Sequence, residues 1–174
     1  HQIEIHECAI SDKNSEKDFF LSTQSNLNTF HNIGTGVEHL SGEIVKVKAQ
    51  TITSLLKGRS IDLIRMDVEG HEVEVLNGMI SSIDDMCKLP MIIFETHLSR
   101  YTKEHDFSET LNRLFNLNYK VRLVGSSSKR GSNNISKFGY EFIKEIKSDG
   151  EIRGIFKNIR SQDAIDLICF KGGI

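Results

Sequence analysis

A short apolar segment that runs directly into a polar turn constrains the fold of this chain most strongly. Residues 61–66 read Ile-Asp-Leu-Ile-Arg-Met and are mostly apolar, as a parallel strand covered on both faces would be. The next apolar residues recur at helical spacing: Val73, Leu76, Ile80 and Ile83. A strand followed at once by a helix is the unit from which α/β folds with parallel sheets are built.

The rest of the chain repeats this alternation. Apolar runs and alternating patterns predict strands at 3–10, 19–21, 45–49, 91–94, 119–124 and 165–170. Helical spacing predicts further helices at 51–56, where Thr51 can cap the first turn, and at 107–115. The polar run 125–134 is predicted to be a mobile loop. The 174 residues therefore predict one α/β domain with a largely parallel sheet.

Composition and charge exclude several classes of protein. The chain has 22 basic and 24 acidic residues, and this net charge of −2 argues against a dedicated nucleic-acid-binding protein. No stretch approaches the roughly 18 consecutive apolar residues of a membrane-spanning helix. The three cysteines, Cys8, Cys87 and Cys169, are widely spaced and odd in number, which indicates reduced thiols. These features predict a cytoplasmic protein with neither a membrane span nor a nucleic-acid partner.

Three predicted strands end in polar residues that are candidates for chemistry. In open α/β sheets, ligands bind outside the carboxyl ends of the strands. These ends carry Ser11 and Asp12 after the first strand, Asp67 after 61–66, and Glu95 and His97 after 91–94. We therefore expect a ligand site at this edge of the sheet.

Some of these carboxylates also have an interpretation that needs no ligand. Glu69, Glu72 and Glu74 lie at a helix start, where the helix dipole stabilises negative charge whatever the function. Asp67 is different, because a carboxylate that ends an apolar strand is partly desolvated and needs a partner. A functional role is therefore expected first for Asp67.

The histidines have similar alternatives. Glu95 and His97 can hydrogen-bond one another or cap a loop, and His71 in a first helical turn is typical of a solvated surface residue. The seven histidines show no spacing of zinc-ligand type, so no metal site is predicted.

The segment around the central strand resembles a known family. Residues 61–78, IDLIRMDVEGHEVEVLNG, resemble the hallmark of the FkbM-type methyltransferases, IDxxKxDVEGxExxVLxG. Other stretches agree in the expected order: ECAISD at 7–12 with Ser25–Leu27 after it, AQTITSLL at 49–56, IIFETH at 92–97, and DAIDLICF at 163–170, which is similar to the closing strand.

This resemblance implies a Rossmann-like class I methyltransferase sheet, mostly parallel with an antiparallel C-terminal strand. It also implies S-adenosylmethionine as the methyl donor. Ser11 and Asp12 would lie near the adenine, and Asp67 near the methionine end of the cofactor. A sugar, lipid or natural-product hydroxyl is the expected acceptor, with Glu69 and His71 as acceptor-binding residues.

The catalytic residues that we expect from this resemblance are Asp67, Glu95 and His97. Methyl transfer needs mainly the alignment of the acceptor with the cofactor, because the sulfonium is already activated. One of the three side chains would take the proton of the acceptor hydroxyl.

The chain departs from the family at its N-terminus. Family members begin with a strand, a glycine-rich DVGANxG loop that lies against the cofactor, a helix and a second strand, and no such segment occurs here. We therefore expect 1–174 to be the C-terminal two-thirds of one methyltransferase domain, truncated at the N-terminus. The strand at 61–66 would then be a bare edge, which favours a homodimer. The alternative function is a methyltransferase-fold module without catalysis, acting in binding or assembly.

Overall fold

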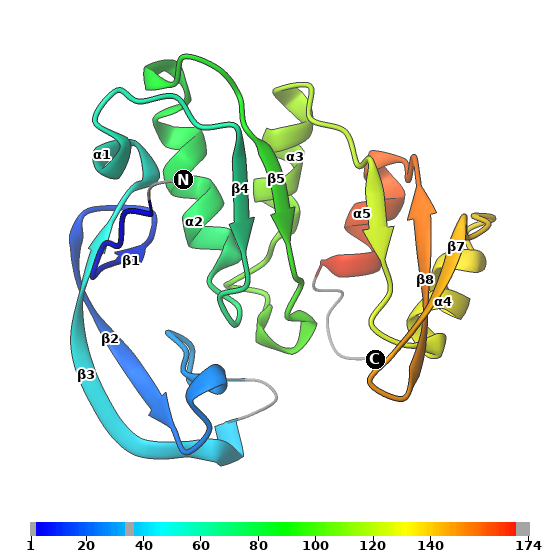
Figure 1. Cartoon of the computed structure of the whole chain (residues 1–174), viewed down its shortest axis with the longest axis horizontal. Coiled ribbons are helices and arrows are strands. Elements are labelled where there is room, and N and C mark those ends of the chain that lie inside the picture. The colour runs from blue at the N-terminus through cyan, green and yellow to red at the C-terminus, as the bar shows by residue number, and fades with distance from the viewer. Residues whose placement is uncertain (1–2, 34–36, 170–174) are drawn as a thin grey trace. The chain divides into compact units, whose positions relative to one another are not determined.

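The computed structural model describes residues 3–33 and 37–169. Its contacts divide the chain into two compact units, His1–Asp106 and Phe107–Ile174, each with its own sheets and helices (Figure 1). Strands and helices alternate in both units, so the predicted mixture of α and β structure is confirmed. The assignment of the whole chain to one methyltransferase-like domain stays a prediction.

The first unit begins with a three-stranded sheet in the order β1-β3-β2. In Figure 1, β2 (Ser15–Ser22) and β3 (Leu40–Gln50) form a long curved antiparallel ribbon, with Phe19 opposite Val45. Strand β1 is short, Ala9–Ile10, and pairs with β3 in parallel. The strand predicted at 3–10 is therefore confirmed only at its last two residues, and the strands predicted at 19–21 and 45–49 are parts of β2 and β3.

A second, two-stranded sheet follows in the same unit. Strand β4 (Leu63–Met66) pairs in parallel with β5 (Met91–Phe94), so that Met66 lies opposite Phe94. Helix α2 (Glu72–Ser81) connects them and buries Val75, Leu76 and Met79. This confirms the predicted unit of strand, helix and parallel strand, and it brings the residues after β4 and β5 to one edge.

The helices are short. Helix α1 (Ile52–Leu56) begins after Thr51, whose hydroxyl accepts a hydrogen bond from the Ser54 backbone N–H at 3.2 Å, as predicted. The described part of the first unit also contains the 3₁₀ turns η1 (Ser25–Leu27), η2 (Val37–His39), η3 (Ile83–Asp85) and η4 (Leu98–Arg100). In residues 3–33 and 37–169, we find no helix with the length and hydropathy needed to cross a membrane.

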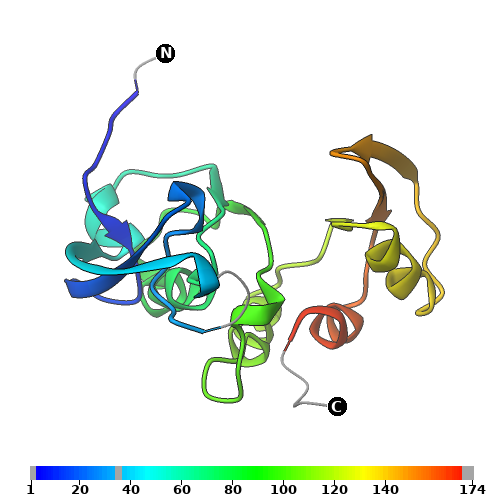
Figure 2. The same cartoon turned by 90° about the horizontal axis from the view of Figure 1, so that it is seen from below.

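The second unit contains an antiparallel sheet in the order β6-β8-β7, formed by β6 (Leu123–Gly125), β7 (Lys144–Ser148) and β8 (Glu151–Lys157). Its helices are α3 (Ser108–Asn116), α4 (Lys129–Ser136) and α5 (Ser161–Ile168). Figures 1 and 2 show α4 and α5 on one face of this sheet, where Ile135, Phe156 and Ala164 form a core. Helix α3 confirms the predicted helix at 107–115. The strand predicted at 119–124 is confirmed only at its last two residues, which belong to β6.

Two predictions for the second unit are wrong. The polar run 125–134 contains most of α4 rather than a loop, because the Ser128 hydroxyl accepts from the Gly131 N–H and Ile135 is buried in the core. Residues 165–168 belong to α5 rather than to a closing strand, because Ala164 and Leu167 pack against the core at helical spacing. Phe170, the last residue of the predicted strand, lies outside the described residues.

The prediction of a mostly parallel sheet is also wrong for the described strands. They form three small sheets, and only two of the five strand pairings are parallel. Two of the antiparallel pairs, β2–β3 and β7–β8, join consecutive strands, which need no crossover connection. The β7–β8 hairpin turns at Asp149 and Gly150, which have positive φ values of 53° and 77°, as in the two-residue turns that suit antiparallel strands.

Candidate functional site at the ends of β4 and β5

A tight turn after β4 positions the candidate site. Asp67 follows β4 directly, and the chain then passes through Glu69 and Gly70, with φ values of 50° and 99°, into α2. A Cβ atom on Gly70 would lie 2.5 Å from the Cβ of Arg100. Only glycine therefore allows the turn to pack this closely against Arg100.

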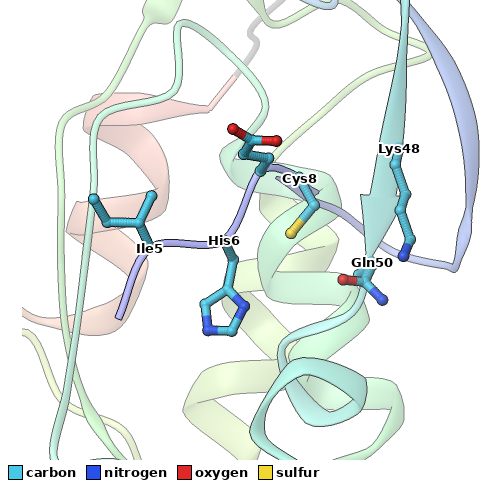
Figure 3. A pocket seen from close by; sticks show the side chains of 6 residues that line it. Ile5, His6, Cys8, Lys48 and Gln50 are labelled. Carbon is cyan, nitrogen blue, oxygen red and sulfur yellow. The ribbon is translucent and has the colours of Figure 1, made fainter. Parts of the chain in front are cut away.

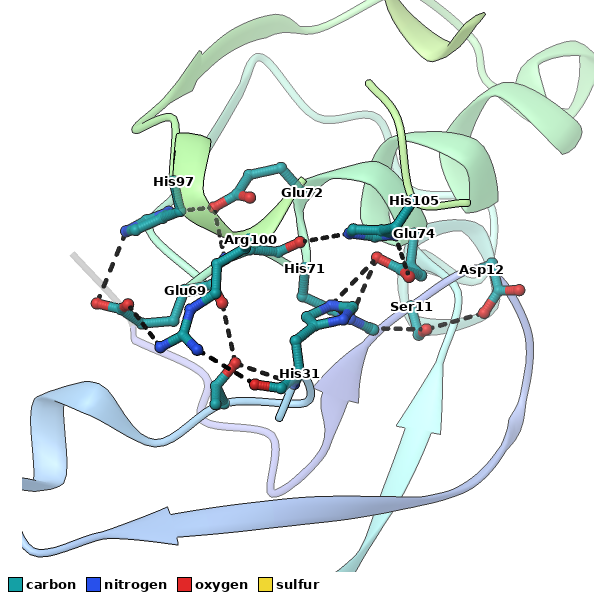
Figure 4. Close-up of polar contacts among 12 residues, drawn as sticks. Ser11, Asp12, His31, Glu69, His71, Glu72, Glu74, His97, Arg100 and His105 are labelled. Atoms are coloured by element: carbon teal, nitrogen blue, oxygen red, sulfur yellow. Dashed lines mark hydrogen bonds and ion pairs between the residues drawn. The ribbon is translucent and has the colours of Figure 1, made fainter. Parts of the chain in front are cut away.

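His97 lies at the centre of the site. Its Nδ1–H donates a 2.8 Å hydrogen bond to Glu72 Oε1, as drawn in Figure 4. Its other nitrogen, Nε2, lies 3.7 Å from Asp67 Oδ1 and 3.6 Å from Glu69 Oε1. The fold thus brings together three side chains that the sequence singled out, Asp67, Glu69 and His97.

Glu72 is the buried member of this group. Its side chain is fully buried, and Oε2 accepts a 3.1 Å hydrogen bond from the Tyr101 hydroxyl. Burial raises the pKa of Glu72, but the hydrogen bonds from His97, from the backbone and from Tyr101, together with the charge of His97, lower the pKa below its ordinary value. The interpretation of Glu72 as a carboxylate that only favours a helix start is therefore incomplete, since it holds His97.

The pKa of His97 is shifted in the opposite direction, above its ordinary value. Burial lowers the pKa of His97, but the hydrogen bond and negative charge of Glu72, together with the charges of Glu69 and Glu95, raise it above its ordinary value. The result is an imidazole whose Nδ1 is held by a buried carboxylate and whose Nε2 faces two partly exposed carboxylates. Such an imidazole is suited to accept or donate a proton at Nε2.

Glu95 lies at the end of β5 and is exposed. Its backbone N–H donates to the Met66 carbonyl at 3.4 Å. The alternative of a Glu95–His97 hydrogen bond does not describe His97, whose Nδ1 bonds to Glu72 instead. Glu95 acts on His97 through its charge.

Ser11, Asp12 and His71 lie together in a neighbouring polar group. The Ser11 hydroxyl donates to Asp12 Oδ1 at 2.9 Å and lies 3.0 Å from His71 Nε2. Asp12 also pairs with Lys17 at 3.1 Å. The expectation of a solvated His71 is wrong, because its side chain is only 2% exposed and its ring packs against Phe30 with centroids 4.4 Å apart.

Burial controls the protonation of the histidines in this neighbouring group. Desolvation, and then the positive charge of other residues, lowers the pKa of His71 to about 3 and that of His31 to about 4. Both imidazoles are therefore neutral at neutral pH. Glu74, which we expected only to favour the start of α2, lies between them and His105.

Some residues that were not predicted as site residues lie at fixed positions of the family hallmark, which is a signal that could have found them. Glu72 and Gly78 occupy fixed positions of the quoted hallmark DVEGxExxVLxG. Glu72 accepts the hydrogen bond from His97, and Gly78 packs against the backbone of Ser11. Tyr101, His31 and His105 carried no such signal, because they lie in irregular segments far from the hallmark.

Hollows elsewhere in the first unit do not involve these residues. A hollow of about 590 Å³ beside β1 is lined by Ile5, His6, Glu7, Cys8, Lys48 and Gln50 (Figure 3). None of the predicted site residues lines it, so the site is defined by the side-chain group around His97 and not by this hollow.

Comparison with known proteins gives a family match that covers the first unit and extends into the second. The model of the methyltransferase FkbM domain family matches residues 1–121. The matched range includes β4, the turn at Glu69 and Gly70, α2 and His97, and it ends before β6. No curated protein and no solved structure matches the chain.

Proposed function

The chain belongs to the methyltransferase FkbM domain family, and we propose that it transfers a methyl group from S-adenosylmethionine to a hydroxyl of a small molecule, glycan or lipid. The observation that supports this proposal is His97, with Nδ1 held by buried Glu72 and Nε2 directed at Asp67 and Glu69. Methyl transfer in general follows from the family, whereas the donor, the hydroxyl acceptor and the roles of single residues are proposed here.

The charges around His97 suit a positively charged donor. Asp67 is 37% exposed and Glu69 is 21% exposed, so both carboxylates can meet a ligand. Arg65 pairs with Asp67 at 3.5 Å and Arg100 with Glu69 at 4.0 Å, but Glu72 and Glu95 add further negative charge around His97. A sulfonium or an ammonium group would therefore be attracted to this edge.

The other two predicted cofactor residues differ in accessibility. Asp12 is 38% exposed, so it stays a proposed contact for the cofactor despite its ion pair with Lys17. Ser11 is fully buried and its hydroxyl is engaged with Asp12 and His71. We therefore assign the Ser11 side chain the role of positioning its neighbours rather than of touching the adenine.

His97 is the proposed general base. S-adenosylmethionine, when bound, supplies a methyl group on an activated sulfonium, so the remaining tasks are to orient the acceptor and to remove its proton. His97 Nε2 accepts the hydroxyl proton, and the charge of Glu72 stabilises the imidazolium that forms. Such proton transfer contributes about 10²- to 10⁴-fold to the rate. Asp67 and Glu69 orient the acceptor hydroxyl, and Glu95 adds negative charge at the same strand end.

A calorimetric titration with S-adenosylhomocysteine, the product of the donor, tests this proposal. We expect micromolar binding, about −8 kcal/mol, and weaker binding by at least about tenfold for Asp67→Ala, which is about 1.4 kcal/mol. Asp62→Ala is the matched control, because Asp62 precedes β4, is 87% exposed and pairs with Lys88. It should bind as the unchanged chain does.

Methyl transfer to a panel of hydroxyl acceptors then separates binding from catalysis. His97→Gln should lose transfer while it keeps product binding, because the side chain acts on the acceptor proton. Transfer that persists in both Asp67→Ala and His97→Gln would remove these residues from the mechanism.

A second function is a binding or assembly module without catalysis. One edge of β4 pairs with β5, and no described strand pairs with its other edge. An unpaired edge favours association with a second copy of the chain. Light scattering that shows a dimer, together with no detectable binding of S-adenosylhomocysteine, would favour this module over the enzyme.

A further inference from the structure

A second group of ligand-type side chains lies beside the proposed methyl-transfer site. His31 comes from the segment after η1, Glu74 from α2 and His105 from the segment after η4 (Figure 4). Each offers one ligand atom, and these atoms lie within 4.8 Å of one another. The three side chains are between 14% and 19% exposed. This group shares no residue with Asp67, Glu69 and His97.

The hydrogen bond of His105 fixes which of its nitrogens carries a hydrogen. Nε2 lies 3.0 Å from the Gly70 carbonyl oxygen, and a carbonyl oxygen can only accept. Nε2 is therefore the donor, and in the neutral ring Nδ1 carries a lone pair. That lone pair is directed at Glu74, since Nδ1 lies 3.3 Å from Glu74 Oε1.

The same reasoning applies to His71, which borders the group. The Ser11 hydroxyl donates to Asp12, so it accepts from His71 Nε2, and Nδ1 of His71 carries the lone pair. This atom lies 3.3 Å from Glu74 Oε2 and 3.3 Å from His31 Nε2. Without an ion, His31 Nε2–H is therefore the donor to His71 Nδ1. An ion that binds His31 Nε2 takes the place of this hydrogen, and the neutral ring of His31 then carries its hydrogen on Nδ1. Glu74 Oε2 is itself buried and has no hydrogen-bond donor among the described residues.

A carboxylate that faces nitrogen lone pairs on two sides is unfavourable unless a proton or a metal cation lies between them. We propose that His31 Nε2, Glu74 and His105 Nδ1 bind a divalent transition-metal ion of the zinc class. Two imidazoles and one carboxylate are a common donor set for such ions.

The distances agree with this assignment. Ligand atoms about 2.0–2.2 Å from a tetrahedral zinc ion lie about 3.3–3.6 Å from one another. Glu74 Oε1 lies 3.3 Å from His105 Nδ1, Glu74 Oε2 lies 3.8 Å from His31 Nε2, and one ligand atom from each of the three residues lies within 4.8 Å of the other two. The bond from His105 to the Gly70 carbonyl is the kind of outer contact that orients metal-binding histidines. The ion would tie two irregular segments to α2, a role separate from methyl transfer.

The first experiment is a calorimetric titration of the chelator-treated chain with Zn²⁺. We expect one ion per chain, and a loss of affinity of more than about 100-fold for His105→Gln and for Glu74→Gln, since even outer contacts are worth 10- to 100-fold. His39→Gln is the matched control, because His39 is 38% exposed and outside the group. It should bind Zn²⁺ as the unchanged chain does.

Hydrogen exchange of the unchanged chain gives a second readout that depends on no variant. Zn²⁺ should slow exchange in 28–33 and 101–106, and a chelator should reverse this effect. Circular dichroism shows whether each variant is folded.

Two outcomes would overturn the proposal. One is an unchanged chain that neither binds Zn²⁺ nor gains protection in these segments, which would mean that protons alone satisfy the group. The other is binding that survives His105→Gln but is lost in His97→Gln, which would place the ion at Asp67, Glu69 and His97 instead.

Discussion

His97 and Glu72 form a charge-assisted hydrogen bond of 2.8 Å in which the carboxylate is fully buried and the imidazole is 15% exposed. Glu72 lies in the first turn of α2, and His97 follows β5, so this bond joins the helix to the end of the neighbouring strand. It fixes the orientation of the imidazole and directs Nε2 at Asp67 and Glu69. The same bond contributes both to stability and to the proposed chemistry.

Tyr101→Phe should destabilise the first unit. The change removes the hydroxyl that donates to Glu72 Oε2 at 3.1 Å and leaves a buried carboxylate oxygen without this donor. Hydrogen bonds to charged groups contribute about 1.5–3 kcal/mol, so we expect a loss of that size in urea unfolding. Because His97 shares the carboxylate, the double variant with His97→Gln should be non-additive by about 0.5–3 kcal/mol. Simple additivity would show that the two donors act independently.

The His97–Glu72 pair should make stability depend on pH. The folded pKa of His97 is raised, so its contribution is fully present below the ordinary value of 6.5 and is lost as the pH rises through the folded pKa. The folded pKa of Glu72 is lowered, so its contribution is present above 4.5 and is lost as the pH falls through the folded pKa.

The difference in unfolding free energy between the unchanged chain and His97→Gln isolates this pair. It should be largest between the two ordinary pKa values and should decrease above neutrality. A difference that stays constant up to pH 9 would exclude a charged His97 as the source of stability.

Gly78→Ala should destabilise the packing of α2. A Cβ atom at this position would lie 2.3 Å from the Ser11 carbonyl oxygen and 2.9 Å from the Asp12 Cα atom, and backbone atoms cannot rotate away. Overpacking of this kind costs about 1–3 kcal/mol, which exceeds the gain of about 1 kcal/mol that alanine brings to a helix. Gly125→Ala is the control, since nothing lies within 4 Å of its added carbon. A Gly78→Ala chain more stable than the parent in urea would show that α2 is not seated against Ser11.

In the second unit, Asp163→Asn should loosen the start of α5. Asp163 accepts from Arg160 Nε at 2.7 Å and from the Tyr140 hydroxyl, and these bonds lower the pKa of Asp163. The contribution is therefore present above the ordinary value of 3.8 and is lost as the pH falls through the folded pKa. Hydrogen exchange of α5 should be faster in the variant at neutral pH and should converge with the parent in acid. Equal exchange at neutral pH would contradict this role.

Local patterns predicted much of the first unit correctly. The Thr51 cap, β4, α2 and β5 followed from short-range spacing, because capping and amphipathic periodicity depend on residues only a few positions apart. The predictions failed where a segment is ambiguous in itself. The run predicted as a strand at 165–170 is apolar enough for one, but packing of Ala164 and Leu167 on the core selects a helix over residues 161–168. The Asp149–Gly150 pair is a strong hairpin signal in the sequence, and it forms the turn between β7 and β8.

The sequence by itself determined which polar residues follow β4 and β5, since a strand delivers the next residues to its own end. It thereby determined that Asp67 and His97 share an edge once the two strands pair in parallel. Only the tertiary structure decided that Glu72 is buried beneath His97 and that His31, Glu74 and His105 meet. These contacts join segments far apart in the chain. Their formation depends on which surfaces are buried together, and no local pattern records this.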